Sequence, residues 1–285
     1  MSPSTGSDQP PAGVAGLPPS LLAGKVVLVT GASAGIGAGL CASLAGLGAT
    51  VVGMARRFGP RSIASLENGK IAEIQGDVTD PADCARVVAA VVGAAGRVDV
   101  LVNNAGSMGA NPIATIVDTT VADFDGMFAV NVRGPFLMAR EVLPRMAAQS
   151  DGLIINLSSF AASIGVAHMA VYGASKAALQ QLSNTIAVEW GLHGVRSVSI
   201  VLGGFDTEMT AGTNKGMFRL AHGPDAEYIP KVSGALLSID DLGRAIGALC
   251  SPAMKIVSGA TIAMDSNISA GSLDSVFIHM LASGD

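Results

Sequence analysis

The sequence predicts an α/β protein, a single domain of the doubly wound type in which one parallel sheet of about seven strands has helices on both faces. From Lys25 onward, short β-branched runs alternate with longer alanine-rich segments, the pattern of parallel strands joined by helical crossovers. The runs are almost continuously apolar, as central strands buried on both faces are, and right-handed crossovers favour the doubly wound topology. A chain of 285 residues, 49% hydrophobic and 14% charged, can bury such a core.

Seven segments fit the strand pattern, and helices are expected to fill most of the gaps between them. In chain order the strands are KVVLVT (25–30), ATVVGM (49–54), KIAEIQG (70–76), VDVLVN (98–103), GLIINLS (152–158), RSVSIVL (196–202) and GATIAM (259–264). Two of the helices, at about 121–149 and 172–190, carry apolar faces broader than one sheet face needs.

The start of the chain and its longest connection fall outside this pattern. The opening MSPSTGSDQPPAGVAGLPPS lacks the basic start and apolar core of a signal peptide, and its composition favours a disordered arm over residues 1–22. The folded domain is then expected to cover residues 23–285. The connection from Gly203 to Ser238 is too long for an ordinary loop, so residues 203–238 are a candidate substrate lid.

Charge and cysteine content argue against several classes of protein. The net charge of -5, without long basic runs, predicts neither nucleic-acid nor membrane-surface binding, and no apolar run approaches the ~18 residues that span a bilayer. The cysteines are far apart and odd in number, which favours buried thiols in the cytoplasm over disulfides or a zinc site. The histidines have no metal-ligand spacing, so no metal is expected. These residues are Cys41, Cys84, Cys250, His168, His193, His222 and His279.

A glycine-rich turn directly follows the first strand, in VVLVTGASAGIGAGL, and leads into a helical run. Glycines at 31, 35 and 37 allow a tight turn and a close approach of the backbone to a phosphate, which free N–H groups at the helix start can bind. The spacing is G-x-x-x-G-x-G and differs from the common G-x-G-x-x-G dinucleotide motif. The turn indicates nucleotide binding, and a purely structural packing turn is the alternative.

The same turn fits a second motif from a different class of enzyme. Gly31 to Gly35 also matches G-x-S-x-G, the nucleophile elbow of α/β-hydrolases, with Ser33 as the nucleophile. A hydrolase draws an oxyanion-hole donor from a loop after an earlier strand, and only the predicted arm precedes this strand. The position of the motif therefore argues against an esterase.

The stretch VYGASKAALQ places Tyr172 four residues before Lys176, so the two side chains share one face of a helix. A surface pair is one interpretation. In the other, the fixed positive charge stabilises the phenolate and lowers the pKa of the tyrosine, which makes it a proton donor and acceptor near neutral pH.

An ordered set of short motifs connects these features. TGASAGIG, GDV (76–78), NNAG (103–106), the asparagine of AVNVRG, INLSS (155–159) and YGASK resemble the short-chain dehydrogenase/reductase family in its compact single-domain branch, over about residues 24–266. The resemblance implies a Rossmann-type fold and an NAD(P)-dependent oxidoreductase that moves hydride between nicotinamide and a carbonyl or secondary alcohol. A binding or regulatory protein on the same fold is the remaining alternative, and the intact Asn-Ser-Tyr-Lys set argues against it.

The resemblance implies a catalytic set of four residues. Tyr172 is the expected acid/base, and Lys176 is expected to bind the nicotinamide ribose and to lower the pKa of the tyrosine. Ser158 and Ser159 both match the family serine, and Ser159 is preferred because it lies thirteen residues before Tyr172. It would bind the substrate oxygen. Asn131 is expected to hold a water molecule in a proton relay behind Lys176.

The cofactor site implied by the resemblance follows the ends of the strands. Ala55 stands where relatives that prefer NAD carry an acidic residue, and Arg56 and Arg57 follow it, so NADP(H) is predicted over NAD(H). Asp77 and Val78 are the expected adenine contacts. The remaining cofactor residues are Gly31, Ser33, Ala34, Gly35, Ile36, Gly37, Asn104, Ala105, Gly106, Tyr172, Lys176, Gly204 and Thr207.

The substrate pocket is predicted to be mostly apolar and to favour bulky hydrophobic or cyclic ketones. Its expected residues are Ser159, His168, Met169, Phe205, Met209, Met217 and Phe218, the last four on a glycine-containing segment suited to a lid; a subunit contact is the alternative for that segment. Gly203-Gly204 replaces the usual Pro-Gly, and Asp265-Ser266-Asn267 replaces the usual Asp-Gly-Gly. The resemblance also implies a homodimer or homotetramer, whereas the two broad apolar helices on their own fit simple core packing.

Overall fold

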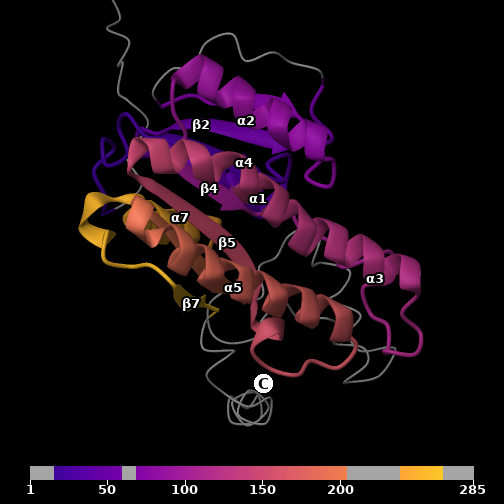
Figure 1. Ribbon diagram of the computed structural model, residues 1–285. Helices are drawn as coiled ribbons and strands as arrows, with labels where there is room; N and C mark the ends of the chain where they lie inside the picture. Colours follow the sequence, from indigo (N-terminus) through magenta and orange to yellow (C-terminus); the bar gives the residue numbers. More distant parts are fainter. Residues whose placement is uncertain (1–15, 60–68, 204–237, 266–285) are drawn as a thin grey trace, which may run out of the picture.

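The seven predicted strands form one parallel sheet of order β3-β2-β1-β4-β5-β6-β7 in the computed structural model, which describes residues 16–59, 69–203 and 238–265 (Figure 1). Every neighbouring pair in the sheet is parallel, which confirms the predicted fold class. The strands are β1 (Val26–Thr30), β2 (Thr50–Ala55), β3 (Ile71–Gln75), β4 (Val100–Asn103), β5 (Gly152–Ser159), β6 (Val195–Leu202) and β7 (Ala260–Met264). The strand order reverses between β1 and β4, where sheets of this type bind ligands at the carboxyl ends of the strands.

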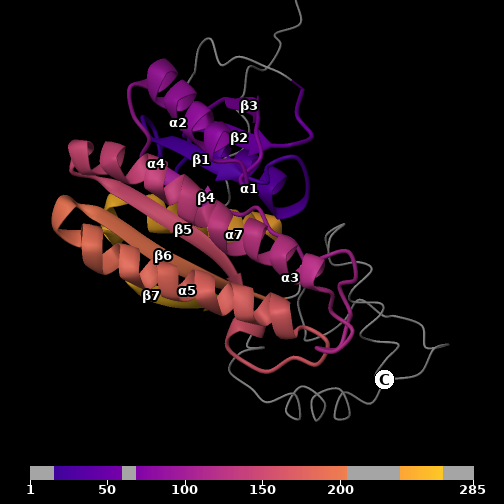
Figure 2. The same cartoon turned by 45° about the vertical axis from the view of Figure 1, so that its right-hand side comes forward.

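Helices cover both faces of the sheet, with α1 and α7 on one face and α2, α4 and α5 on the other (Figures 1 and 2). They are α1 (Gly35–Gly46), α2 (Pro81–Ala95), α3 (Val121–Phe128), α4 (Gly134–Gln149), α5 (Ala170–Trp190) and α7 (Ile239–Cys250), with short turns η1 (Ala129–Arg133), η2 (Phe160–Ala162), η3 (Gly191–His193) and η4 (Pro252–Met254). Local sequence fixes several helix starts. The carboxylate of Asp80 caps α2, which has Pro81 in its first turn, and the hydroxyl of Ser238 caps α7.

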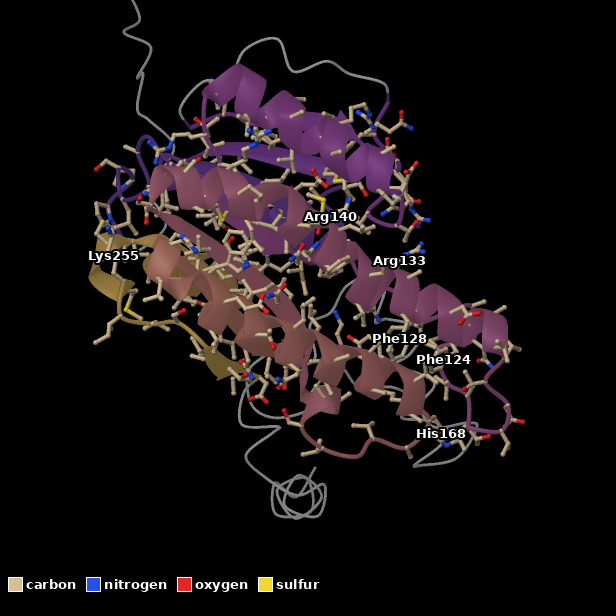
Figure 3. The ribbon with its side chains drawn as sticks, in the orientation of Figure 1. Phe124, Phe128, Arg133, Arg140, His168 and Lys255 are labelled. Carbon is tan, nitrogen blue, oxygen red and sulfur yellow. The ribbon has the colours of Figure 1, made fainter. Side chains whose placement is uncertain are left out.

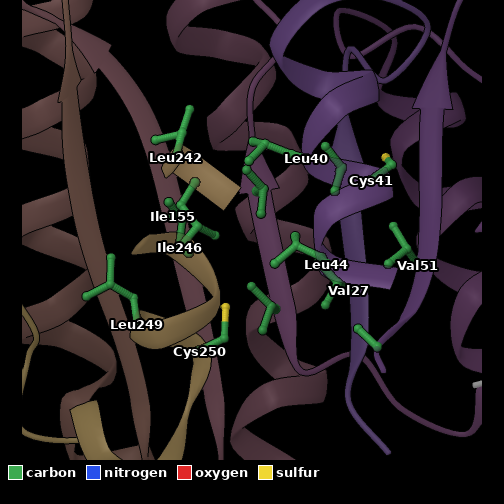
Figure 4. Close-up of a cluster of buried hydrophobic side chains, with 14 of the residues drawn as sticks. Val27, Leu40, Cys41, Leu44, Val51, Ile155, Leu242, Ile246, Leu249 and Cys250 are labelled. Carbon is green, nitrogen blue, oxygen red and sulfur yellow. The ribbon is translucent and has the colours of Figure 1, made fainter. Parts of the chain in front are cut away.

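The core between α1, α7 and the sheet depends on close contact between the two helices (Figure 4). Leu40, Leu44 and Ile246 are completely buried there. A β-carbon at Gly243 would lie 2.3 Å from the Ser43 side chain, and one at Gly247 would lie 2.3 Å from Leu47. Glycine is therefore required on α7 for the helices to approach this closely.

The folded domain begins earlier than the sequence predicted. Leu22, assigned to a disordered arm, is 1% exposed, and its N–H donates a hydrogen bond to the Leu47 carbonyl at 2.8 Å. Leu17 and Leu21 pack against the same core. Apolar burial of these leucines outweighs the Pro and Gly content that suggested disorder, so residues 16–22 belong to the fold. Residues 1–15 lie outside the described part of the chain.

The three cysteines are free and buried, in agreement with the prediction that they are small core residues. Burial raises the pKa of Cys41 and Cys250 to about 12 and that of Cys84 to about 11. Within the described residues, no cluster of His, Cys, Asp and Glu side chains could hold a metal ion. Over the same part of the chain, no helix is both long and apolar enough to cross a bilayer.

Candidate active site

A cleft of about 790 Å³ opens at the carboxyl ends of the central strands. Its size falls in the range of sites for small molecules and cofactors, and it runs from the glycine turn after β1 to the start of α5. The cleft is lined by Gly31, Ser33, Ala34, Gly35, Ile36, Gly37, Met54, Ala55, Arg56, Arg57, Gly76, Asp77, Val78, Asn104, Ala105, Gly106, Ser107, Met108, Gly109, Ala110, Ala122, Asp123, Gly126, Val130, Leu157, Ser158, Ser159, Phe160, Met169, Tyr172, Lys176, Leu202 and Gly203.

The glycine turn is built for close contact with the turn after β4. Gly31 has a φ of +68°, and a β-carbon at Gly37 would lie 2.4 Å from the Gly31 carbonyl oxygen. The Asn104 amide donates to the Thr30 carbonyl at 2.8 Å, while the Thr30 hydroxyl accepts from the N–H of Asn104 at 3.1 Å. Thr30, the first residue of TGASAGIG, supports this turn and was not among the residues expected to form the site.

The start of α1 lies at one end of the cleft. Ala34 precedes the helix without a side-chain cap, and the first turn carries no acidic residue. The first N–H groups of the helix therefore have no capping side chain and are available to a phosphate, which the positive end of the helix dipole also favours. The residues present fit a dinucleotide.

Two arginines border this end of the cleft. The Arg57 Nε atom donates to the Ser33 hydroxyl at 3.2 Å, and a guanidinium nitrogen of Arg56 lies 3.9 Å from the Asp77 carboxylate. Ala55 at the end of β2 contributes no carboxylate that would repel a phosphate. Ser33 has an arginine as its partner, and neither described histidine lines the cleft, so the described residues give no support to a hydrolase.

Tyr172 and Ser159 meet because the start of α5 packs closely on η2. A β-carbon at Gly173 would lie 2.5 Å from the Ala161 carbonyl oxygen, so only glycine allows this approach. Ser159, at the end of β5, accepts a hydrogen bond from the Ala161 N–H at 3.3 Å. Burial raises the pKa of Tyr172, and a hydrogen bond with Ser159 partly offsets this.

Lys176 is buried one helical turn after Tyr172, with 5% of its surface exposed. Its Nζ atom donates to the Leu157 carbonyl at 2.9 Å and lies 5.8 Å from the centre of the Tyr172 ring. Burial lowers the pKa of Lys176 to about 8. The expectation that the lysine lowers the pKa of the tyrosine is corrected here: the pKa of Tyr172 is raised, because removal of the phenolate from water dominates.

The choice between the two serines follows from the side of β5 on which each lies. The Ser158 hydroxyl donates to the Lys176 carbonyl at 3.2 Å and accepts from the Gln180 side chain at 3.0 Å, so it anchors α5 to the sheet. Ser159 is the serine that bonds to the phenol of Tyr172.

Asn131 lies in a π-helical turn, η1, which interrupts the helix expected over residues 121–149. The side chain is fully buried. Its amide nitrogen donates to the Ser107 carbonyl at 2.8 Å and to the Ser175 hydroxyl at 2.9 Å, and its oxygen accepts from the Ser107 N–H at 2.8 Å. No sequence pattern predicts this π-turn. Ser175, however, stands within YGASK and could have been considered.

The predicted substrate residues are only partly brought together. Met169 lines the cleft, as do Phe160, Met108 and Val130, which the sequence analysis did not name. His168 is not among the lining residues; it lies on the loop before α5, on the side of the molecule that carries α3, with a φ of +65° (Figure 3). The predicted residues Gly204, Phe205, Thr207, Met209, Met217 and Phe218 lie outside the described residues.

A family model described as short chain dehydrogenase matches residues 25–217. The chain belongs to the short-chain dehydrogenase family. An uncharacterized oxidoreductase of Thermotoga maritima is 36% identical over 225 residues, which cover 78% of this chain and 85% of that protein. The D-threitol dehydrogenase of Mycolicibacterium smegmatis is 33% identical over 254 residues, which cover 86% and 92% of the two chains.

The structure also resembles that of a solved reductase. The crystal structure of levodione reductase superposes with a TM-score of 0.77 at 25% identity, over 88% of this chain and all of the other. The protein is therefore an NAD(P)-dependent dehydrogenase/reductase that acts on alcohol and carbonyl groups. Its glycine turn, uncapped helix start and strand-end turns are the residues that would hold the dinucleotide.

Proposed function

We propose that the enzyme is an NADP(H)-dependent ketoreductase that uses Tyr172 as its proton donor. The observation that carries this proposal is the position of Tyr172, Ser159 and Lys176 in the same cleft as the glycine turn. When bound, the nicotinamide supplies or accepts the hydride. Each of the three side chains then has a separate part in handling the proton and the substrate oxygen.

Tyr172 and Ser159 define where a carbonyl oxygen would bind. The Ser159 hydroxyl is placed to hold that oxygen, and the phenol of Tyr172 gives its proton to the oxygen as negative charge develops there. Because burial raises the pKa of Tyr172, the phenol is protonated at neutral pH. This state is the one that carbonyl reduction requires.

Lys176 compensates the charge left on the tyrosine. With a pKa of about 8, the side-chain amine of Lys176 is mostly in its charged ammonium form at neutral pH, and it lies near the ring of Tyr172. It stabilises the phenolate after proton transfer, and we assign it to the nicotinamide ribose as well. Asn131 is proposed to hold the water through which the tyrosine is reprotonated.

The preference for NADP(H) is proposed from Arg56 and Arg57. Both side chains border the end of the cleft where the glycine turn begins, and Arg57 is tied to Ser33. The Arg57 guanidinium beside the Ser33 hydroxyl, with Arg56 preceding it in the chain, forms a suitable site for the 2′-phosphate. Asp77 and Val78 are assigned to the adenine, and Asn104 to Gly106 to the support of the cofactor.

The substrate is proposed to be a bulky apolar or cyclic ketone. Met108, Val130, Phe160 and Met169 provide apolar walls in the cleft that also contains Ser159. Asp123 lines the same cleft, and hydrogen bonds from the Ala110 N–H and the Thr120 hydroxyl lower its pKa, so it presents a negative charge that disfavours acids. The sequence of residues 205–220 supports an apolar lid.

Assembly as a homodimer or homotetramer in the cytoplasm completes the proposal. Phe136 on α4 and Val188 on α5 are exposed, which supports contact between copies through these helices. Free thiols at all three cysteines suit a reducing compartment.

The proposal is tested by following NADPH and NADH oxidation with a panel of ketones that ranges from small keto acids to bulky cyclic compounds. We expect turnover with NADPH and a bulky ketone. Esterase activity that is lost in Ser33→Ala, without any nicotinamide oxidation, would overturn the proposal in favour of a hydrolase. Cofactor binding without turnover of any ketone or alcohol would instead support a regulatory protein.

A further inference from the structure

Ser175 connects two parts of the proposed proton-transfer machinery without lining the cleft itself. It is completely buried on α5, one residue before Lys176. Its hydroxyl donates to the backbone carbonyl of Tyr172 at 2.7 Å. A serine hydroxyl has only one hydrogen, so toward Asn131, at 2.9 Å, it can only accept.

The amide of Asn131 has its orientation fixed by these contacts. Its two N–H groups go to Ser175 and to the Ser107 carbonyl, and its oxygen accepts from the Ser107 N–H. Both hydrogens are therefore used, and one acceptor position on the oxygen is left. Rotation of the amide would place N–H against N–H at Ser107, which opposes the change.

The orientation of this amide matters because its oxygen and the ammonium of Lys176 both approach Gly106, in the turn after β4. A β-carbon at Gly106 would lie 3.6 Å from Nζ of Lys176 and 3.7 Å from Oδ1 of Asn131. Both polar atoms therefore face the same position beside the backbone of Gly106. A shift of Asn131 would change the polar atoms around this position.

We propose that Ser175 is a positioning residue for the reaction, acting through Asn131 to keep the amide oxygen beside Gly106 and Lys176. The inference rests on the proposed function, in which Tyr172 and Lys176 carry out the proton chemistry. Without the serine hydroxyl, one N–H of a fully buried amide has no partner, and only the two bonds to Ser107 still hold the side chain in place. The backbone carbonyl of Tyr172 loses the hydrogen bond from the Ser175 hydroxyl at the same time.

The variant Ser175→Ala separates this role from ordinary packing when it is compared with Ser183→Ala. Ser183 is a matched control, because it lies two turns further along α5, is 1% exposed, and bonds through its hydroxyl to Ser197 at 2.8 Å. We expect similar losses of thermal stability in both variants. The kcat for ketone reduction should fall about tenfold in Ser175→Ala alone, with the dissociation constant for NADPH within about twofold of wild type.

A double-mutant cycle with Asn131→Ala tests whether the serine acts through the asparagine. The double variant is expected to have the kcat of Asn131→Ala alone, because removal of the amide leaves Ser175 nothing to position. Additive losses, or equal losses of kcat in Ser175→Ala and Ser183→Ala, would overturn the inference. If Ser175→Ala does not fold, Ser175→Cys, which keeps a small side chain and a weak hydrogen bond, replaces it in the same cycle.

The variant Tyr172→Phe distinguishes failure of this inference from failure of the proposed function. A Tyr172→Phe enzyme with wild-type turnover would remove the proposed function itself. An inactive Tyr172→Phe enzyme beside a fully active Ser175→Ala enzyme would remove only the role of Ser175.

Discussion

The Nζ atom of Lys176 lies 5.8 Å from the centre of the Tyr172 ring, one helical turn along α5; the lysine is buried, and the tyrosine is partly buried at the wall of the cleft. Burial disfavours the charged form of each, so the pKa of the lysine falls to about 8 while that of the tyrosine rises. At neutral pH the pair holds an ammonium beside a protonated phenol. Each of these two states can be tested.

Replacement of the two residues should impair the enzyme in different ways. Tyr172→Phe keeps the ring but removes the acid, so we expect kcat to fall by at least the ~10²-fold typical of lost general acid catalysis, with little change in NADPH affinity. Lys176→Ala should lose both turnover and affinity. Steady-state kinetics together with NADPH titration of both variants make the comparison, and wild-type turnover in Tyr172→Phe would exclude the catalytic assignment.

The rate of carbonyl reduction should depend on pH through Lys176. Below a pH of about 8 the ammonium is present, and above it the charge is lost, while the raised pKa of Tyr172 keeps the phenol protonated. We therefore expect kcat/KM for ketone reduction to be level at neutral pH and to fall as the pH rises through about 8. A profile that stays level to pH values well above the ordinary lysine range would contradict this assignment.

The buried lysine should cost the protein stability. Its pKa is lowered from 10.5 to about 8, so the folded state binds fewer protons than the unfolded chain between these values. The penalty is complete below a pH of about 8 and is relieved as the pH rises toward 10.5. At ~1.4 kcal/mol per pKa unit, this burial penalty amounts to about 3 kcal/mol. The hydrogen bond to the Leu157 carbonyl stabilises the fold by only about 1 kcal/mol and does not offset it.

The variant Lys176→Met should therefore unfold at an equal or higher temperature than wild type at pH 7, although it has lost turnover. The difference in the free energy of unfolding should shrink in alkaline buffer, where the wild-type lysine is neutral in the folded state. Calorimetry of both proteins at pH 7 and in alkaline buffer measures this difference in the free energy of unfolding. A variant destabilised by more than about 1 kcal/mol at neutral pH would show that the lysine stabilises the fold.

Cofactor preference should depend on the two arginines after β2. Arg56→Ala and Arg57→Ala are each expected to lower kcat/KM for NADPH by about tenfold or more, through loss of a charged hydrogen bond to the 2′-phosphate, and to leave NADH nearly unchanged. Arg140 on α4 (Figure 3), which pairs with Glu141 and does not line the cleft, is the control position. Equal effects on both cofactors would contradict the proposed 2′-phosphate site.

Gly173 should be required for the meeting of Tyr172 and Ser159. An alanine there would bring a β-carbon to 2.5 Å from the Ala161 carbonyl oxygen and push α5 away from η2. We expect Gly173→Ala to reduce kcat strongly and to lower the melting temperature. Gly93→Ala in α2, where nothing lies within 4 Å, should instead stabilise the fold by about 0.5–1 kcal/mol. Thermal unfolding and ketone reduction assays compare the two, and full activity in Gly173→Ala would show that glycine is dispensable.

The amino-acid sequence was enough to locate the seven strands along the chain and the glycine turn, and to predict the four residues proposed as the catalytic set. These depend on local patterns: continuous apolar runs mark buried parallel strands, and a spacing of four places Tyr172 and Lys176 on one helical face. The resemblance to a known family suggested roles for residues that periodicity alone does not identify. The strand and helix patterns can be recognised in the sequence because they depend only on residues close together in the chain.

The tertiary structure was needed to show how Asn131 is held and in which direction the pKa of Tyr172 moves, whereas Ser159 had already been preferred from its spacing to Tyr172. Ser158 and Ser159 point to opposite sides of one strand, so their roles depend on where α5 packs. The π-turn at 129–133 has no local signal, and Leu22 is ordered because a core formed by distant residues covers it. The burial that shifts a pKa results from contacts with several helices and strands, so it cannot be predicted from a short segment of sequence.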